Sequence, residues 1–378
     1  MRILVVIYEF PPIGGGGGRA AYDICKDLVS RGHQVMVLTA HMRGLPLEET
    51  RDGIQLMRIR SLRAEAFRAS FMTMLSYVLA GLWPGLRLIW RHRPEIIHTH
   101  FAVPSGALAW LLSILSWIPY VLTAHLGDVP DGVPEKTGRW FRWIKPLTYP
   151  IWKRAKRIVA VSEYTRQLAL KHYPVTVSVI PNGADVKLLA PSAIKLNHPP
   201  RLVFAGRFVP QKNPLAIVRI LFELQDLEWN CAMLGDGPLL NDVKRELEGY
   251  GMQHRFDLPG WVTPDEVLDC FTRSDILFMP SLSEGLPVVG VQALAKGLAL
   301  VVSRIGGFAD LVDDGRNGYL IEPQDKGGFK NVLRKLLTDE TVLFGCRSAS
   351  LQKAPFFDVA RIAGQYEEAF RSVIEEFN

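Results

Sequence analysis

The sequence predicts an α/β protein of two doubly wound, parallel-sheet domains that face each other across a cleft. Three observations support this fold class. The chain has 378 residues, more than one hydrophobic core of ordinary size accommodates. Short apolar runs rich in β-branched residues alternate with longer helical patterns, as in sheets covered on both faces. A proline-rich stretch at 187–200 separates two such series.

Twelve apolar runs predict the strands. Those of the first domain are Ile3–Ile7, Gln34–Thr39, Ile96–His100, Tyr120–Thr123, Arg157–Val161 and Val177–Ile180. Those of the second domain are Leu202–Ala205, Asn230–Leu234, Phe256–Leu258, Ile276–Met279, Leu300–Val302 and Gly318–Ile321. Ligands of doubly wound sheets bind beyond the carboxyl ends of the strands. Polar residues directly after these runs are therefore candidates for a binding site.

The composition is that of a globular protein in a reducing compartment. A hydrophobic fraction of 48% and a charged fraction of 22% exclude wholesale disorder. The cysteines are too far apart for a disulfide framework or a zinc site, which fits the cytosol. They are Cys25, Cys231, Cys270 and Cys346. The N-terminal apolar run ends at Glu9, so we expect no cleavable signal and a cytoplasmic location.

Two long uncharged stretches have the composition of membrane segments. Residues 69–86 lack charge, but Pro84 and two glycines interrupt them, so we expect no spanning helix there. Residues 96–127 contain no Asp, Glu, Lys or Arg. Pro104 and Pro119 divide this second stretch into strand, helix and strand, which predicts a buried β-α-β unit.

A run of glycines, Gly14–Gly18, lies between the first predicted strand and a helix expected to begin near Arg19. Glycines let backbone amides come close to an anion, and a helix N-terminus adds partial positive charge. The spacing matches neither the phosphate loop of nucleoside triphosphatases nor the dinucleotide fingerprint. The run predicts an anion-binding loop; a flexible loop without a ligand is the alternative.

Gly206, Arg207 and Lys212 directly follow the first strand of the second domain. Two cations at a strand end suit a diphosphate whose charge grows as it leaves. Arginine offers a planar fork of donors and lysine a compact charge. The alternative is an ordinary surface pair.

Glu284 precedes Pro287, which we place in the first turn of a helix Val289–Lys296. The amides of Leu286–Val289 would then form a second anion site. A carboxylate beside bound phosphate is unfavourable unless it accepts hydrogen bonds from hydroxyl groups, such as those of a sugar. This juxtaposition predicts a functional role for Glu284.

His125 ends the apolar strand Tyr120–Thr123 and precedes a glycine. At that position it can donate a hydrogen bond to a sugar hydroxyl or transfer a proton. A purely structural histidine is the alternative interpretation.

In order and spacing, these residues together resemble glycosyltransferase family 4, retaining enzymes of the GT-B fold, over nearly the full chain. The resemblance includes the glycine run, His125, Arg207, Lys212 and Glu284. Further matching segments are Leu28–Val35, Val161–Glu163, Ile180–Asp185, Leu234–Pro238, Leu258–Val262, Gly306–Gly307 and Asp314–Gly318.

The resemblance implies two Rossmann-like domains and a final helix, Phe356–Phe377, that crosses back onto the first. Residues 1–187 plus 358–378 would bind the acceptor, and residues 188–357 the nucleotide-sugar donor. Among the implied site residues, His125, Arg207, Lys212 and Glu284 form the catalytic set. The donor-binding set is Gly15, Gly16, Gly206, Gly237, Val262, Gly285, Leu286, Pro287, Val288 and Gln292.

Within that set the resemblance implies individual roles. Arg207 and Lys212 bind the diphosphate, Gly15 and Gly16 approach the phosphates and the transferred sugar, and His125 contacts that sugar near the reacting centre. Val262 flanks the base, and Glu284 holds sugar hydroxyls. Gln292 stands where the family usually has a second glutamate, which grips the donor ribose. Glutamine keeps hydrogen bonds but loses the charge-assisted grip.

The sequence contains no Asp-x-Asp triplet, and we expect no metal and no cofactor. Retention without a covalent nucleophile implies front-face displacement, in which the departing diphosphate helps to deprotonate the acceptor. A nucleotide-sugar epimerase of the same fold and a non-catalytic sugar-nucleotide sensor stay open. Nucleic-acid binding lacks a recognition motif.

The acceptor domain is the basic one: residues 1–190 hold 24 Lys or Arg against 13 Asp or Glu. Aromatics interleave with cations at Trp140–Pro146 and Trp152–Arg157, and Phe67–Trp90 adds apolar surface. Such a face suits an anionic membrane. We expect a protein peripheral to the inner face of the membrane that glycosylates a lipid or a lipid-linked glycan. A small soluble acceptor, with these aromatics in the core, is the alternative.

Overall fold

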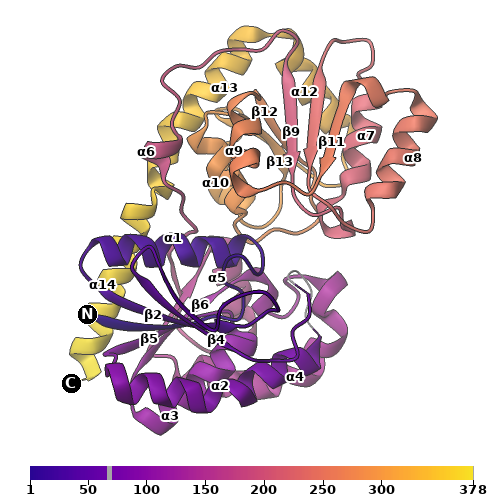
Figure 1. The fold of residues 1–378 in the computed structure, drawn as a ribbon. Coiled ribbons are helices and arrows are strands. Elements are labelled where there is room, and N and C mark those ends of the chain that lie inside the picture. Colours follow the sequence, from indigo (N-terminus) through magenta and orange to yellow (C-terminus); the bar gives the residue numbers. More distant parts are fainter. Residues whose placement is uncertain (66–69, 378) are drawn as a thin grey trace. The chain divides into compact units, whose positions relative to one another are not determined.

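The structure is a computed structural model that describes residues 1–65 and 70–377; the side chains of 134–143 lie outside the description. The chain forms two compact units. Unit 1 comprises Met1–Gly183 and Val359–Asn378, and unit 2 comprises Ala184–Asp358. Each unit is an α/β body around a sheet that is parallel, except for one antiparallel edge pair in unit 1 (Figure 1). The sequence had placed the corresponding boundaries at 187/188 and 357/358.

Within the described residues, the sheet of unit 1 has eight strands in the order β3-β4-β2-β1-β5-β6-β7-β8. The strands are β1 Arg2–Val6, β2 Gln34–Ala40, β3 Glu48–Arg51, β4 Ile54–Ile59, β5 Ile96–His100, β6 Tyr120–Ala124, β7 Arg157–Ala160 and β8 Ser178–Val179. All neighbours are parallel except β3 and β4, which are antiparallel. The predicted strands of this domain are confirmed. The β3–β4 pair was missed because β3, EETR, is a polar strand at the sheet edge, without the apolar pattern of a buried strand.

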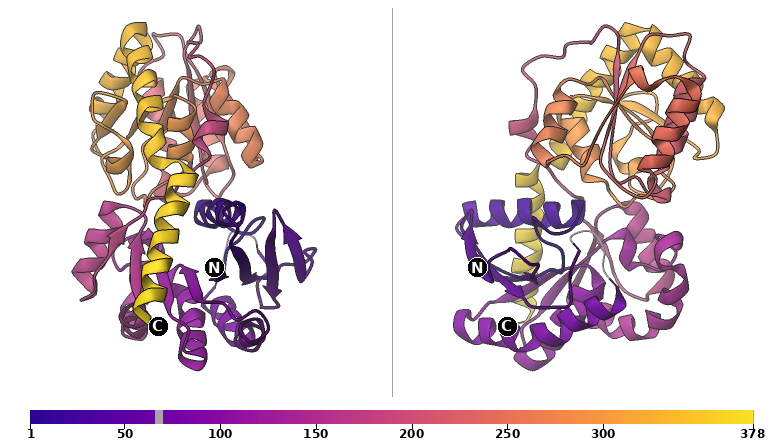
Figure 2. Two further views of the ribbon diagram at one scale, coloured as in Figure 1. Left: turned by 90° about the vertical axis from the view of Figure 1, so that its left-hand side faces the viewer. Right: turned by 45° about the vertical axis from the view of Figure 1, so that its right-hand side comes forward.

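Helices cover both faces of this sheet (Figure 2). They are α1 Gly16–Ser30, α2 Phe71–His92, α3 Ala107–Ser116, α4 Pro134–Arg154, α5 Glu163–His172 and α14 Val359–Phe377. One core joins the sheet to α2 and α3 through Tyr77, Leu108 and Leu112. The other joins it to α1 and α14 through Leu28 and Phe370. The predicted buried β-α-β unit is β5, α3 and β6.

Helix α2 contradicts the expectation that Pro84 and two glycines interrupt residues 69–86. It begins at the N-cap Ser70, whose side chain accepts from Thr73 N, and it continues through Pro84 to His92. The glycines do not interrupt the helix; they let it pack closely. A Cβ on Gly81 would lie 2.6 Å from a methyl of Leu108. By length and composition, α2 is the one described helix that could cross a membrane, but this packing makes it a layer of unit 1.

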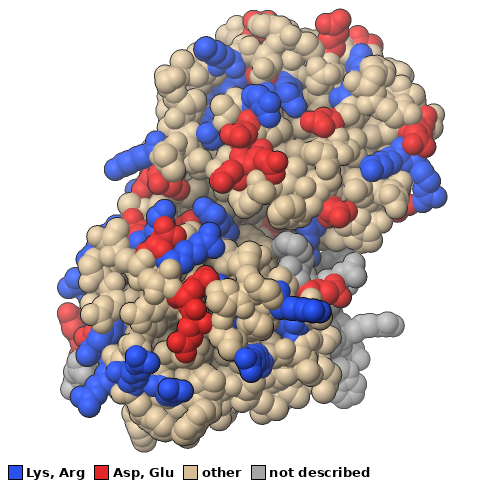
Figure 3. Space-filling model, viewed as in Figure 1, with Lys and Arg blue, Asp and Glu red and all other residues tan. Residues whose placement is uncertain are grey.

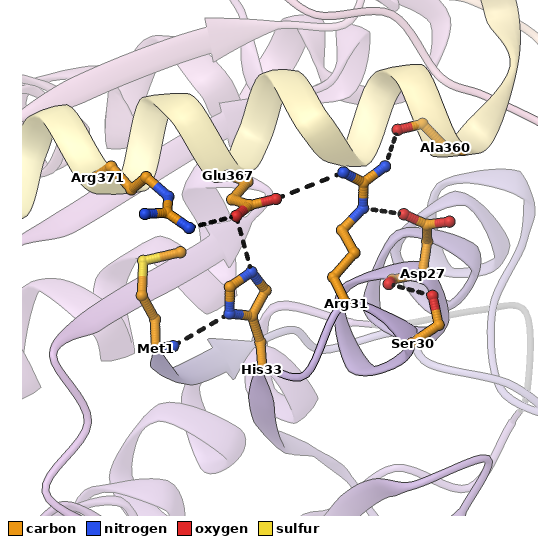
Figure 4. A network of polar contacts seen from close by, with 8 residues as sticks. All are labelled: Met1, Asp27, Ser30, Arg31, His33, Ala360, Glu367 and Arg371. Carbon is orange, nitrogen blue, oxygen red and sulfur yellow. Dashed lines mark hydrogen bonds and ion pairs between the residues drawn. The ribbon is translucent and has the colours of Figure 1, made fainter.

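The C-terminal helix α14 is bound to unit 1 by a polar network (Figure 4). The side chain of Arg31 donates to Asp27 at 2.6 Å and to the carbonyl of Ala360, and it lies 3.4 Å from Glu367. His33 lies between the N-terminal amine of Met1 and Glu367, at 3.1 and 3.3 Å. A segment more than 300 residues away in sequence thus becomes part of the first unit.

The sheet of unit 2 is parallel throughout, in the order β11-β10-β9-β12-β13-β14. Its strands are β9 Arg201–Ala205, β10 Asn230–Leu234, β11 Phe256–Gly260, β12 Ile276–Met279, β13 Ala299–Ser303 and β14 Gly318–Ile321. Its helices are α6 Val186–Leu189, α7 Pro214–Phe222, α8 Leu240–Tyr250, α9 Pro264–Thr272, α10 Val288–Ala295, α11 Phe308–Leu311, α12 Lys326–Thr338 and α13 Glu340–Lys353. All six predicted strands of this domain are confirmed.

Candidate active site

In both units the strand order reverses direction at one point. In unit 2 the chain runs from β9 outward to β11, then returns to β12 beside β9 and runs outward the other way. The loops after β9 and β12 start on either side of this point, which is where doubly wound sheets bind their ligands. These loops, residues 206–213 and 280–287, are called the switch-point loops of unit 2.

Lys212 and Glu284 join the two switch-point loops. Lys212 Nζ donates to Glu284 Oε1 at 2.5 Å. The Glu284 side chain is 5% exposed and the Lys212 side chain 15%. Leu282 N donates to Gln211 O at 2.7 Å, and Gln211 Nε2 donates to Ser283 O at 2.9 Å. The two loops are thus joined by an ion pair rather than carrying two independent charges.

Arg207 differs from Lys212. Its side chain is exposed and forms no ion pair within the described part of the chain. A guanidinium held at the strand end without a carboxylate partner is available to an anionic ligand, and its fork matches phosphate oxygens.

The remaining donor-site predictions lie on neighbouring loops at the same sheet edge. Gly206 follows β9, Gly237 follows β10, and Val262 follows β11. Backbone hydrogen bonds connect these loops: Gly206 N to Leu234 O at 2.9 Å and Gly235 N to Gly260 O at 2.8 Å. Beside Val262, the indole of Trp261 is 60% exposed; the resemblance implies that Val262 and its neighbours flank the base, a role that stays a prediction.

Helix α10 begins one residue earlier than predicted. Pro287 is its N-cap, not a member of its first turn, and the helix comprises Val288–Ala295. The amides of a first helical turn have no partner within the helix, so the N–H groups of Val288 and Val289 are the candidates for the predicted anion site, and Gly285 and Leu286 lie before the helix. Gln292 lies in the second turn, partly buried.

A second glycine turn supports the loop that carries Glu284. Gly307 N donates to Glu284 O at 3.2 Å, and Gly306 has a positive φ of 47°. A Cβ on Gly307 would lie 1.6 Å from Gly285 O. In the sequence this pair stands out only as a motif, because a lone Gly-Gly gives no indication of what it packs against.

Gly307→Ala is therefore expected to displace the Glu284 loop and to weaken donor binding at least ~10-fold, because backbone atoms cannot yield as a flexible side chain can. Isothermal titration with the nucleotide sugar measures this. Gly249→Ala is the matched control, since a Cβ there meets nothing within 4 Å. Equal donor affinity in both variants would contradict the supporting role of Gly307.

In unit 1, the strand order reverses between β1 and β5, and the glycine run follows β1. Helix α1 begins at Gly16 with Gly15 as its N-cap, earlier than the predicted start near Arg19. A Cβ on Gly15 would meet nothing within 4 Å, whereas one on Gly17 would lie 2.7 Å from the ring of Phe101. Gly15 and Gly16 are exposed and can admit a ligand; Gly17 is required for internal packing.

His125 lies beside this glycine turn. Its ring stacks on Phe101 with centroids 4.3 Å apart, and it would lie 3.3 Å from a Cβ on Gly17. Burial lowers the pKa of His125 to about 4. The imidazole is therefore neutral at pH 7 and can donate one hydrogen bond and accept another.

Asp128 holds the loop that carries His125, a role that sequence analysis missed. The buried carboxylate accepts from His125 N at 2.8 Å and from Ala102 N at 2.9 Å. It thereby connects the ends of β5 and β6 next to Phe101, whose φ is 70°. The only feature of the sequence that points to this role of Asp128 is its position three residues after His125.

Two further histidines, in the strand IHTH, extend from His125 into the core. His100 Nδ1 lies 3.4 Å from His125 Nε2. His98 Nε2 hydrogen-bonds Thr123 Oγ1 at 2.9 Å, and Thr123 Oγ1 hydrogen-bonds Tyr366 of α14 at 3.1 Å. Burial lowers the pKa of His98 to about 3 and that of His100 well below its usual value. Within the described residues, no His, Cys, Asp or Glu cluster is arranged to hold a metal ion.

The structure corrects the predicted basic-aromatic surface in one segment. Trp152 is fully buried and stacks on Tyr173 with centroids 4.5 Å apart, so it belongs to the core. In Trp140–Pro146, the side chains of 140–143 lie outside the described residues. In the third segment, Phe67–Trp90, residues 67–69 lie outside the described part of the chain, and α2 exposes an apolar stripe along its length: Phe71, Met72, Leu75, Leu79, Trp83 and Trp90.

Two curated relatives have named activities. The UDP-Gal:alpha-D-GlcNAc-diphosphoundecaprenol alpha-1,3-galactosyltransferase of Escherichia coli is 28% identical over 68% of this chain and 70% of its own length. The D-inositol 3-phosphate glycosyltransferase of Corynebacterium glutamicum is 24% identical over 100% of this chain and 98% of its own.

Solved structures share the fold. Sucrose-phosphate synthase from Thermosynechococcus elongatus has a TM-score of 0.86 over 99% of both chains at 17% identity. Anabaena HepE in complex with UDP has a TM-score of 0.78, again at 17% identity, over 98% of this chain and 100% of its own. The fold is thus GT-B.

Family models match both halves of the chain. "Glycosyltransferase Family 4" matches residues 14–188, and "Glycosyl transferases group 1" matches residues 190–350. The first match ends at residue 188 and the second begins at residue 190, close to the unit boundary at Gly183 and Ala184. The chain therefore belongs to the family 4 glycosyltransferases of the GT-B fold, hexosyltransferases that use a nucleotide-sugar donor.

Proposed function

We propose that this enzyme transfers a hexose with retention of configuration, without a metal, to a hydroxyl of a lipid or lipid-linked glycan at a membrane surface. The observation that supports donor binding is the Lys212–Glu284 ion pair at the switch point, whose Nζ and Oε1 atoms are 2.5 Å apart. Arg207, on the same loop as Lys212, is exposed. These residues supply two cations for a diphosphate and one carboxylate for sugar hydroxyls.

In this proposal the donor competes for both members of the ion pair. The diphosphate takes hydrogen bonds from Lys212 and Arg207, and Glu284 turns from the ammonium to the hydroxyls of the sugar. Exchange of one charged partner for another avoids leaving a buried charge unpaired. The N-terminus of α10, at Pro287 and Val288, adds partial positive charge toward the phosphates.

The reaction then needs no protein nucleophile. The bond between the anomeric carbon and the β-phosphate oxygen breaks, and the acceptor hydroxyl oxygen bonds to that carbon on the same face. The acceptor proton passes to the departing phosphate oxygen. Arg207 and Lys212 stabilise the charge that develops there. Neutral His125 contributes a hydrogen bond to the transferred sugar without repelling the cationic character of the anomeric centre.

The acceptor assignment rests on unit 1. Helix α2 exposes Leu79, Trp83 and Trp90 by 67%, 65% and 59%, and Arg87 and Arg91 alternate with them. Apolar side chains interleaved with arginines suit a membrane interface. The relative that acts on a diphosphoundecaprenol-linked sugar supports a lipid-linked acceptor. The relatives named for D-inositol 3-phosphate support the alternative, a small soluble acceptor.

The test combines binding and turnover. We expect one nucleotide sugar of a panel to raise the melting temperature through linkage, and nucleotide release to need a lipid-linked acceptor. NMR of the product should show the anomeric configuration of the donor, and EDTA should leave the rate unchanged. Release of an altered nucleotide sugar without acceptor would instead identify an epimerase. Transfer to inositol phosphate but to no lipid would overturn the acceptor assignment.

A further inference from the structure

Unit 1 has a pocket away from the candidate active site. It lies between the β3–β4 pair and α2 and has a volume of about 440 Å³. Figure 3 shows Lys and Arg side chains over the lower part of unit 1, where Figure 1 shows α2 and α3. The proposed transfer reaction assigns this pocket no role.

Two arginines line the pocket from opposite elements. Arg60 follows β4 and Arg87 belongs to α2. Both are exposed, and neither forms an ion pair within the described residues. A third, Arg58, is already neutralised: its guanidinium donates to Glu49 at 2.7 Å and to Pro46 O at 2.8 Å. The charge available to a ligand therefore comes from Arg60 and Arg87.

One carboxylate, Glu48, shares the pocket with them. It is exposed and forms no ion pair among the described residues. A bare phosphate would be repelled by it. A ligand that carries a phosphate and free hydroxyls fits better, because a carboxylate accepts hydrogen bonds from hydroxyls while the arginines bind the phosphate.

The rest of the wall is apolar and continues onto the exposed stripe of α2. Trp83 belongs to both: it lines the pocket and packs edge-on against Trp90 with centroids 5.6 Å apart. Tryptophan favours the boundary between lipid headgroups and acyl chains. A headgroup in the pocket would therefore lie at the depth where its acyl chains can meet the stripe.

We propose that this pocket binds the headgroup of an anionic phospholipid whose phosphate carries a hydroxylated alcohol, such as glycerol or inositol. Arg60 and Arg87 hold the phosphate, Glu48 accepts the hydroxyls, and Trp83 enters the interface. The inference rests on the proposed membrane location and names the lipid class that establishes it.

Co-sedimentation of the full chain with vesicles tests this. The vesicles contain phosphatidylcholine with equal mole fractions of phosphatidylglycerol, phosphatidylserine or phosphatidic acid. We expect phosphatidylglycerol to bind best. Arg60→Ala combined with Arg87→Ala should weaken that binding at least ~10-fold. Arg91→Ala, one turn along α2 and outside the pocket, should weaken binding to all anionic vesicles equally and keep the preference.

Glu48→Gln separates headgroup recognition from charge alone. It should keep binding to anionic vesicles but lose the preference for phosphatidylglycerol over phosphatidic acid. The proposal that the pocket binds a headgroup is overturned if the wild type binds all anionic vesicles equally. It is also overturned if the double arginine variant keeps the preference for phosphatidylglycerol. Competition by free inorganic phosphate as strong as that by glycerol phosphate overturns it as well.

Sugar transfer to a short-chain, water-soluble analogue of the acceptor, measured without vesicles, keeps the two proposals apart. The arginine and Glu48 variants should retain wild-type turnover there. If the pocket variants lose vesicle binding but no lipid acceptor is ever glycosylated, the acceptor assignment fails and the lipid site stands. Concentration-dependent dimerisation that Trp83→Ala abolishes, with no vesicle binding, would replace the lipid by a second copy of the chain.

Discussion

Arg207→Ala is expected to lower kcat for sugar transfer by at least ~10²-fold, with little change in stability. The guanidinium is exposed and has no protein partner in the described chain, so its removal leaves no buried group unpaired. Its loss raises the free energy of the transition state, in which negative charge grows on the departing diphosphate. Steady-state turnover and a thermal melt of the same preparation measure both effects.

Lys212→Met should produce a similar loss of turnover and, unlike Arg207→Ala, a loss of stability. It strands the Glu284 carboxylate, which is 5% exposed on its side chain, and breaking a buried pair costs roughly 3 kcal/mol. Adding Glu284→Gln should restore much of the stability but not the turnover. Arg219→Ala, which removes an exposed arginine paired with Glu246 on the same unit, is the control. Near-normal turnover without Arg207 or Lys212 would remove them from the mechanism.

Acidification is expected to destabilise unit 1 strongly. The folded-state pKa of His98 is about 3 and that of His125 about 4, and that of His100 is also depressed by burial. An unfolded histidine titrates near 6.5, so below that pH the unfolded chain binds more protons. Stability present at neutral pH is therefore lost as the pH falls toward 4, by about 2 kcal/mol per histidine between pH 7 and 5.

The variant His98→Phe separates the loss of stability caused by histidine protonation from the loss caused by protonation of carboxylates. The ring packs against Tyr366 and Phe370 with centroids 4.9 and 5.0 Å away, contacts that phenylalanine can keep. Urea unfolding at pH 7 and pH 5 should show that this variant loses about 2 kcal/mol less than the wild type. His254→Ala, at an exposed site in unit 2, should follow the wild type. Equal losses in all three proteins would mean that His98 is protonated in the fold.

The strands of both sheets follow from the sequence because buried parallel strands are apolar on both faces. Segments that are not apolar on both faces cannot be predicted from the sequence in this way. The polar strand β3 is stabilised by pairing with β4, and α2 tolerates Pro84 because Gly81 and Gly85 pack against α3. In the first case the adjacent strand β4 decides the local conformation, and in the second case the separate helix α3 does.

Some residues of the candidate site can likewise be predicted from the sequence, and others cannot. Arg207, Lys212, Glu284 and His125 stand out in the sequence as polar residues after apolar strands. Asp128 and Gly307 do not, because their roles consist of contacts with backbone atoms of other loops. The roles that the resemblance implies for the first four stay predictions, and the variants above test them.

The sequence by itself determined the two doubly wound domains and, through the family resemblance, the reaction class, and it predicts the edge of each sheet where ligands bind. Alternation of apolar runs, strand-end polar residues and ordered motifs are all local signals. Only the tertiary structure decided that Lys212 and Glu284 neutralise each other, that Trp152 is core while Trp83 is surface, and that Arg60 and Arg87 share a pocket. The physical reason is that charge pairing and burial depend on neighbours in space, and those neighbours come from segments far apart along the chain.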